Sequence, residues 1–109
     1  MNQQLQLAKA IGKPIMLDFY ADWCISCKQM DRFTFSQPDV QKALTPFRLL
    51  RANVTANDPK DQALLHTFQV VAPPTLLFFN PRGEEIGQAR IVGEISATEL
   101  IKHLENIKY

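Results

Sequence analysis

The order of apolar runs along the chain is the strongest constraint on its fold. Short, strongly apolar segments at 14–20, 47–54 and 75–80 are separated by stretches that have helical periodicity. An apolar run with few polar residues is typical of a strand that is covered on both faces. Strands that alternate with helices predict an α/β fold, here a central mixed β-sheet flanked by helices.

Capping residues and turns mark the other elements. The expected helices are 3–11, 24–33, a segment with Ser36 as N-cap and Pro38 in its first turn, a segment capped by Asn57 or Asp58, and a last helix that begins at Ser96. The turn at 80–85 predicts that a strand over 86–92 returns antiparallel to the preceding run. The expected order is helix, strand, two helices, strand, helix, two strands and a final helix.

Length and composition limit the classes of function. The chain has 109 residues, of which 46% are hydrophobic and 21% charged, as is ordinary for one globular domain. A net charge of +1 gives no electrostatic signature for nucleic acid or an anionic membrane. No apolar run approaches the roughly 18 residues of a membrane span, and the first residues lack the pattern of a secretion signal. We therefore expect a single monomeric domain over 1–109, without a nucleic-acid partner or direct membrane insertion.

Both cysteines of the chain, Cys24 and Cys27, follow the first apolar run. A purely structural disulfide between them would close a very short loop and would stabilise the fold little. The pair supplies only two of the about four ligands of a structural zinc, and the histidines, His66 and His103, lie on other expected helices. A c-type haem would need histidine where Lys28 follows the second cysteine. We therefore expect no metal.

A redox couple fits the position of the pair best. A C-x-x-C sequence between a strand and a helix is typical of dithiol chemistry. Cys24 would lie at the helix N-terminus, where unpaired N–H groups and the helix dipole stabilise a thiolate. Cys27, one turn further along, would be more buried. The pattern predicts an accessible attacking thiol and a sheltered resolving thiol.

Several segments resemble a known family. "MLDFYADWCISCK" resembles the active-site segment of the thioredoxin superfamily, whose fold matches the expected element order over nearly the whole chain. "PPT" at 73–75 resembles the cis-proline loop of that superfamily, with Pro74 as the expected cis residue and Pro73 as the alternative. "ADWCxxCK", "TFSQPDVQKAL" and "ANVTANDPKD" more narrowly resemble the C-terminal periplasmic domains of bacterial membrane thiol:disulfide interchange proteins.

The narrower resemblance implies a function. Such a domain takes electrons from a transmembrane domain and passes them to a further periplasmic domain of the same inner-membrane protein, which serves disulfide isomerases and cytochrome c biogenesis. The chain would then be an excised periplasmic domain that acts as a protein-disulfide reductase. Cys24 would be its nucleophile and Cys27 its resolving thiol, with no cofactor besides their disulfide. Its partners would be protein disulfides and dithiols.

Two other functions stay open at this point. A free-standing thioredoxin-like reductase or isomerase with its own substrates would carry the same motif. Membrane spans upstream in the full gene would favour the relay instead. A redox-inert binding module that keeps the fold is a third possibility, and the presence of both cysteines together with Asp18 argues against it.

The carboxylates near the cysteines are candidates for proton transfer. Asp18 interrupts the first apolar run and matches the buried acid that, in the family, accepts a proton beneath the resolving cysteine. Burial should raise its pKa toward the range that suits a general base. Asp31 follows Cys27 by four residues and so shares its helical face. The family typically has Glu there, which leaves Asp31 either in contact with the cysteines or in solvent.

The charges around the pair predict the direction of the couple. Asp18, Asp31 and an exposed Asp22 stand against a single nearby cation, Lys28. This excess of negative charge disfavours a thiolate at Cys24, whereas strong oxidants stabilise theirs. The count therefore predicts a reducing couple.

Residues around the expected site would bind the partner. Trp23, directly before the nucleophile, is expected to be exposed on the docking face. Pro73 has no N–H to donate to a bound strand, so one hydrogen bond of the strand-like docking seen in the family should be missing, and docking should be transient. Gly93 matches a family glycine near the site, where a partner backbone approaches closely.

Overall fold

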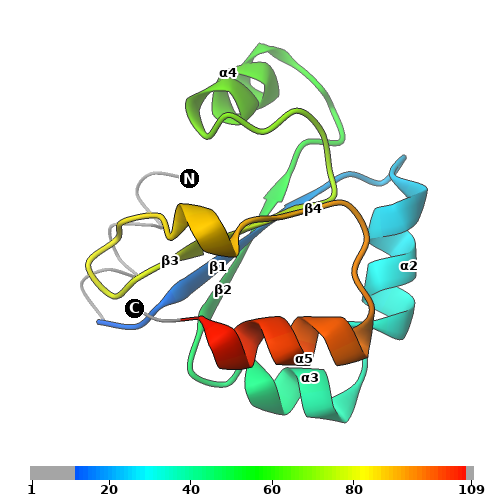
Figure 1. Cartoon of the computed structure of the whole chain (residues 1–109). Helices are drawn as coiled ribbons and strands as arrows, with labels where there is room; N and C mark the ends of the chain where they lie inside the picture. The colour runs from blue at the N-terminus through cyan, green and yellow to red at the C-terminus, as the bar shows by residue number, and fades with distance from the viewer. Residues whose placement is uncertain (1–11, 108–109) are drawn as a thin grey trace.

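The computed structural model describes residues 12–107 of the chain. Its elements are β1 (Ile15–Tyr20), α2 (Ile25–Phe33), α3 (Pro38–Ala43), β2 (Arg48–Asn53), α4 (Pro59–Thr67), β3 (Thr75–Phe79), the short 3-10 helix η1 (Gly87–Ala89), β4 (Ile91–Val92) and α5 (Ala97–Asn106), as Figure 1 shows. The predicted order of strands and helices is confirmed from the first strand onward. The expected helix over 3–11 lies outside the described residues.

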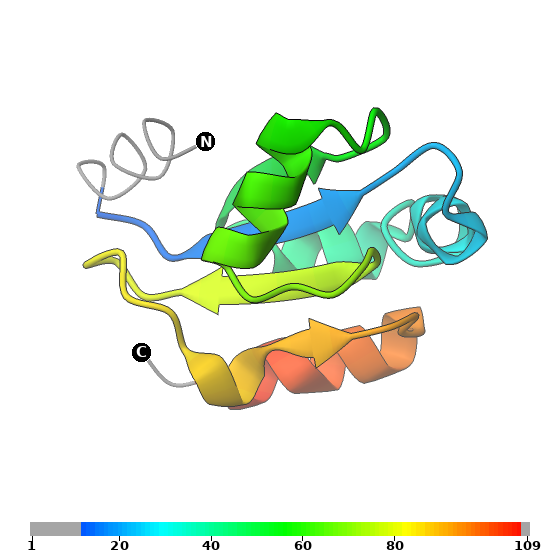
Figure 2. The ribbon, with the colours of Figure 1, turned by 90° about the horizontal axis from the view of Figure 1, so that it is seen from above.

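The sheet is mixed, with strand order β2-β1-β3-β4. β1 pairs in parallel with β2 and antiparallel with β3, and β4 pairs antiparallel with β3. Every residue of β1 is buried, as expected for a strand that is covered on both faces. In Figures 1 and 2, α4 lies over one face of the sheet, and α3 and α5 lie over the other. The predicted α/β sandwich is confirmed.

The alternation of side chains along β1 divides the core between these two faces. One face of β1 packs with Leu65 of α4 through Ile15, Leu17 and Phe19. Phe68, just after α4, lies edge-on to the ring of Phe19. Met16, from the opposite face of β1, belongs to the second cluster, which also contains Val40, Leu44, Leu100 and Leu104. Asp18 is on the same face of the strand as Met16, because side chains two residues apart point the same way. The carboxylate therefore lies on the face that α3 and α5 cover.

Two local predictions about helix starts differ in outcome. Ser36 is not an N-cap: α3 is capped by Gln37 without a side-chain hydrogen bond, while the Ser36 hydroxyl donates to the carbonyl of Arg32 in the preceding turn. The hydroxyl of a serine just after a helix can bind one of the last carbonyls of that helix instead of capping the next helix. Sequence spacing alone does not show which of the two bonds forms. Of the two predicted caps of α4, Asn57 and Asp58, the structure has Asp58, which accepts from the N–H of Asp61.

The predicted strand over 86–92 is wrong in length. β3 makes a single bridge from Phe79 to Glu85, just before the predicted range, and ladder pairing resumes only at β4. The intervening η1 turn places Ala89 in the core, and Gly87 begins that turn. Glycine and alanine are poor strand formers, so burial of Ala89 prevails over continued pairing.

Among residues 12–107, no helix combines the length and the apolar character that crossing a membrane requires.

Candidate active site

The two cysteines form a disulfide at the start of α2, with their Cα atoms 5.2 Å apart. Cys24 is the N-cap of the helix, and its sulfur accepts a hydrogen bond from the N–H of Cys27 at 3.1 Å. A free N–H group of the helix N-terminus is thus directed at the sulfur of the predicted nucleophile. After reduction, the same N–H and the helix dipole would favour a thiolate there.

The two cysteines differ little in exposure. Cys24 is 7% exposed and Cys27 is 3% exposed, and both belong to the core cluster on the α4 face of the sheet. The order agrees with the prediction that Cys27 is the more sheltered residue. The predicted contrast between an accessible and a covered thiol is small in the disulfide form.

Asp18 is buried beside an arginine that sequence reasoning missed. The parallel register of β1 and β2 places Asp18 opposite Arg51. One carboxylate oxygen, Oδ2, accepts from Nε of Arg51 at 3.1 Å and from its Nη2 at 2.8 Å. Burial raises the pKa of Asp18 to about 6, with Asp31 adding to the rise and the Arg51 guanidinium opposing it. The predicted burial and raised pKa of Asp18 are both confirmed.

Asp31 binds the other edge of the same guanidinium. Its carboxylate accepts from Nη2 of Arg51 at 2.6 Å and from Nη1 at 3.1 Å. Hydrogen bonding to Asp31 raises the pKa of Arg51 further above its usual range. Asp31 is therefore connected to Asp18 through Arg51. The sequence had suggested either contact with the cysteines or a position in solvent, and the structure shows a third arrangement.

This arrangement corrects the charge count made from the sequence. The sequence count set three aspartates against one cation, Lys28. Arg51 is a second cation beside these carboxylates, so the excess negative charge is half of what the sequence suggested. The signal that would have found it is the pairing of β1 with β2. Asp18 and Arg51 are 33 residues apart in the sequence, so their pairing depends on how the two strands pack and not on any local spacing.

A second group of polar contacts lies at the mouth of the site. The exposed Asp22 carboxylate accepts from the Tyr20 hydroxyl at 2.9 Å and lies 3.9 Å from Nζ of Lys28. The ring of Tyr20 lies under the Arg51 guanidinium, 4.3 Å from ring centroid to the guanidinium carbon. Tyr20 therefore connects the exposed charges at the mouth with the ion pair between the buried Asp18 and the part-exposed Arg51.

The residues predicted to bind a partner surround the disulfide end of the sheet. The peptide bond between Pro73 and Pro74 is cis, so Pro74 is the cis residue, and its carbonyl accepts from the N–H of Gly93 at 2.9 Å. Trp23 is 55% exposed, and its indole N–H donates to the carbonyl of Thr55. Trp23 and Pro73 line one open cavity of about 390 Å³ between the site and α4.

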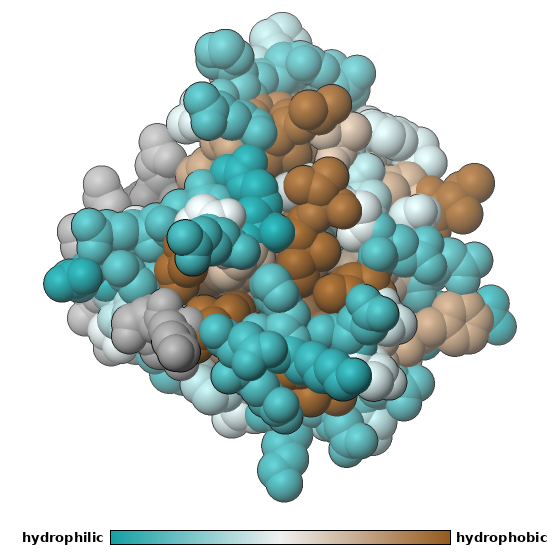
Figure 3. All heavy atoms as spheres, viewed as in Figure 1, coloured by the Kyte–Doolittle hydropathy of each residue, from teal (hydrophilic) through white to brown (hydrophobic). Residues whose placement is uncertain are grey.

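Exposed apolar side chains extend this surface. Figure 3 shows apolar atoms gathered between α4 and β4 on a face that is otherwise largely hydrophilic. Ile25, Val71 and Val92 are 77%, 96% and 75% exposed. Sequence reasoning did not single out these three residues, because their exposure depends on how the elements that carry them pack. Gly93 has φ +95°, and no heavy atom lies within 4 Å of the position that a Cβ would take.

In the part of the chain that the structure describes, no three His, Cys, Asp or Glu side chains are grouped to hold a metal ion. His66 is exposed, and His103 packs against the ring of Phe78 with a ring nitrogen 2.6 Å from the carbonyl oxygen of Ala89.

The class of this protein is defined by its fold, by the disulfide of its C-x-x-C motif and by its cis-proline loop: it is a protein of the thioredoxin class. The chain belongs to the thioredoxin-like domain family, whose profile matches residues 1–108. It is 53% identical over 106 residues to the thiol:disulfide interchange protein DsbD of Salmonella typhimurium, and 52% identical over 106 residues to DsbD of Escherichia coli K12. Each alignment covers 97% of this chain but only 18% of the relative, so the chain spans about a fifth of the length of these relatives.

Solved structures locate the similarity within DsbD. The C-terminal domain of Neisseria meningitidis DsbD, in its reduced form, matches with a TM-score of 0.79 and 34% identity, over 99% of this chain and 97% of that one. A thioredoxin from Thermus thermophilus matches with a TM-score of 0.79 and 30% identity, over 95% of this chain and 80% of that one. The resemblance to C-terminal interchange domains that the sequence motifs predicted is confirmed.

Proposed function

We propose that this chain is a thiol–disulfide oxidoreductase domain of a larger membrane protein, and that it relays electrons as a reductant from a membrane domain to a periplasmic partner domain. The observation that carries the proposal is the Cys24–Cys27 disulfide at the N-terminus of α2, in a chain that matches DsbD over 97% of its own length. The small share of DsbD that is covered supports a neighbouring domain as partner.

The relay consists of two exchange steps. The Cys24 thiolate attacks a sulfur of the partner disulfide, which forms a mixed disulfide and releases the other partner sulfur as a thiolate. The Cys27 thiol then gives its proton to the Asp18 carboxylate and attacks the sulfur of Cys24. The bond between Cys24 and the partner breaks, the internal disulfide forms, and the partner leaves with two electrons as a dithiol. A dithiol of the membrane domain restores the reduced pair by the reverse sequence.

Docking in this proposal uses the surface around the disulfide. Trp23 supplies an exposed aromatic face, and the open space over Gly93 accommodates a partner backbone. Pro73 offers no N–H to an incoming strand, so the complex is held by fewer main-chain hydrogen bonds. Short-lived docking suits a domain that must release one partner before it meets the next.

The reduction potential of the Cys24–Cys27 couple tests the direction of transfer. The protein is equilibrated with glutathione or dithiothreitol buffers, and the reduced fraction is read by mass spectrometry after thiol alkylation. We expect a value near or below about −220 mV, in the range of thioredoxin-like reductants. A value near about −120 mV would make the domain an oxidant and would refute the proposed direction.

A further inference from the structure

The side chain of Arg90, the residue just before β4, joins separate segments of the chain. Its Nε and Nη2 donate to the two carboxylate oxygens of Glu85 at 2.9 and 2.8 Å. Its Nη2 also donates to the carbonyl of Phe68 at 2.9 Å, and its Nη1 donates to the carbonyl of Gln69 at 3.0 Å. Four of the five N–H groups of the guanidinium are therefore used.

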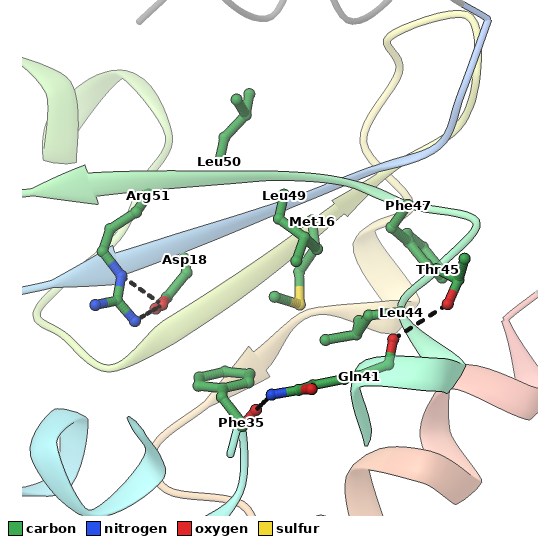
Figure 4. Close-up of a pocket in the computed structure, with 10 residues that line it drawn as sticks. All are labelled: Met16, Asp18, Phe35, Gln41, Leu44, Thr45, Phe47, Leu49, Leu50 and Arg51. Atoms are coloured by element: carbon green, nitrogen blue, oxygen red, sulfur yellow. Dashed lines mark hydrogen bonds and ion pairs between the residues drawn. The ribbon is translucent and has the colours of Figure 1, made fainter. Parts of the chain in front are cut away.

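These contacts are distinct from those that Arg51 makes in the redox site. Arg51 binds Asp18 beside a pocket of about 500 Å³, which Figure 4 shows, and Arg90 does not line that pocket. The side chains of Arg90 and Glu85 are 22% and 26% exposed, so most of their surface is shielded from solvent. An ion pair with two parallel hydrogen bonds fixes the orientation of the guanidinium as well as its position.

The carbonyls that Arg90 binds belong to the residues where the chain leaves α4. Phe68 is the C-cap of that helix, and Gln69 has φ +55°, in the left-handed region that residues with a Cβ adopt at a cost. The last carbonyls of a helix lack partners within the helix and carry partial negative charge, which a cation stabilises. Arg90 therefore holds the turn from which residues 70–74 start.

Arg90 also links the two borders of the docking surface around Trp23, Pro73 and Gly93. On one side, residues 70–74 lead from the turn after α4 to β3 and contain no helix or strand. On the other side, β4 has only two residues, and the N–H of Gly93 donates to the carbonyl of Pro74 at 2.9 Å. Neither border is held by a long run of main-chain hydrogen bonds. A side chain that binds the start of one border from the start of the other therefore sets the distance between them.

We propose that Arg90 is a positioning residue for partner docking, which holds residues 70–74 in a fixed place relative to β4 and so shapes the surface that receives a partner segment. The inference rests on the proposed function, because it takes Pro73 and Gly93 as parts of the docking surface. Arg90 touches neither sulfur nor partner in this role and acts through the two borders that it joins. Glu85 anchors the guanidinium, since its backbone bridges to the end of β3.

Two disulfide probes with the same leaving group separate docking from chemistry. The first is dithiobis(nitrobenzoate), which is small and presents no peptide chain to the docking surface. The second is a decapeptide whose central cysteine is joined to thionitrobenzoate through a disulfide. The Cys24 thiolate attacks the peptide sulfur, a disulfide forms between Cys24 and the peptide, and thionitrobenzoate leaves as a coloured thiolate. Attack on dithiobis(nitrobenzoate) releases the same group, so the initial rates of release are directly comparable.

The reduced proteins compared are wild type, Arg90→Gln, Arg90→Lys and the matched control Arg82→Gln. Arg82 also pairs with a glutamate, at 3.1 Å, but its side chain is 81% exposed, so its variant removes the same charge outside the junction. We expect Arg90→Gln to raise the half-saturating peptide concentration at least about fivefold, the effect of about one net hydrogen bond. The maximal rate with the peptide and the rate with dithiobis(nitrobenzoate) should stay as in wild type. Arg90→Lys should restore part of the peptide binding, because lysine keeps the charge but not the planar fork.

Amide hydrogen exchange measures the loosening of the docking surface without any probe. The N–H of Gly93, which donates to Pro74, should exchange faster in Arg90→Gln than in Arg82→Gln. The N–H of Val54 donates to the carbonyl of Tyr20 at 2.8 Å, next to β2, and should keep its wild-type rate. Val54 therefore separates local loosening from a loss of global stability.

The outcomes separate failure of this inference from failure of the proposed function. If Arg90→Gln slows both probes alike, or neither, the role of Arg90 is refuted while the redox function stands. Equal acceleration of exchange at Gly93 and Val54 also refutes it, because Arg90 then only stabilises the fold. If the wild type releases no thionitrobenzoate from either probe, the proposed function fails, and exchange at Gly93 decides whether Arg90 holds the docking surface. Arg90→Lys and Glu85→Gln provide the same readings if Arg90→Gln does not fold.

Discussion

Replacing Asp18 by asparagine should make the protein more stable at neutral pH. Asparagine has nearly the same shape as aspartate, and its side-chain oxygen can take the place of Oδ2, which accepts both hydrogen bonds from Arg51. The substitution therefore removes the charge and keeps the local contacts. Any change in the free energy of unfolding then reports the cost of holding an ionised carboxylate in this buried place.

The size and sign of the effect follow from the pKa of Asp18. Burial raises it from 3.8 to about 6, against the influence of Arg51, so the native protein binds a proton more tightly than the unfolded chain does. The contribution of Asp18 to the free energy of unfolding is then greatest below pH 3.8 and is lost as the pH rises through 6. The loss amounts to roughly 3 kcal/mol at pH 7. Asp18→Asn should recover about that much, or roughly 13 °C in melting temperature for a domain of this size.

Urea unfolding of the oxidised protein, followed by circular dichroism from pH 4 to 8, measures this directly. The difference in the free energy of unfolding between Asp18→Asn and wild type should be near zero at pH 4 and should grow to its full value above pH 6. Asp22→Asn is the matched control, because its side chain is 63% exposed and its free energy of unfolding should change little at any pH. A variant that is less stable than wild type at pH 7, or a difference that does not depend on pH, would refute the reasoning.

Two further outcomes follow from the site. Cys27→Ala should accumulate a mixed disulfide with a model peptide disulfide, which mass spectrometry detects as an added mass that dithiothreitol removes. Cys24→Ala should accumulate none. Equal trapping by both variants would contradict the assigned roles. Gly93→Ala should lower the free energy of unfolding by about 1 kcal/mol through its positive φ rather than through a clash, and should leave the reduction potential unchanged. Gly87→Ala is its control, because Gly87 also has open space around it but no positive φ.

Sequence reasoning succeeded where a local signal determines the structure. The burial of Asp18 was predictable because a lone carboxylate between Leu17 and Phe19 breaks an otherwise apolar run. The start of α2 at the cysteines and the cap at Asp58 were predictable because capping depends on residues within one turn. These features need only the chemistry of neighbouring residues.

It failed where the outcome depends on how distant segments pack. Ser36 is a local exception: it is a residue type that favours N-caps, but its hydroxyl binds the carbonyl of Arg32, four residues earlier. The strand expected over 86–92 is interrupted because Ala89 fits into the core formed by other elements. Arg51 carries no local signal in the sequence, and only the pairing of β2 with β1 brings it to Asp18.

In the proposed mechanism, the pairing of Asp18 with Arg51 explains how one carboxylate can be both buried and able to accept a proton. An exposed aspartate, with a pKa of 3.8, would hold an abstracted proton weakly. A buried aspartate without a cation would stay protonated at neutral pH and could accept nothing. Burial and Arg51 act in opposite directions, burial prevails, and the resulting pKa of about 6 leaves Asp18 mostly ionised at pH 7 yet able to bind a proton. The same balance destabilises the fold at neutral pH, so a more stable Asp18→Asn protein should also be a slower one in the step that Cys27 performs.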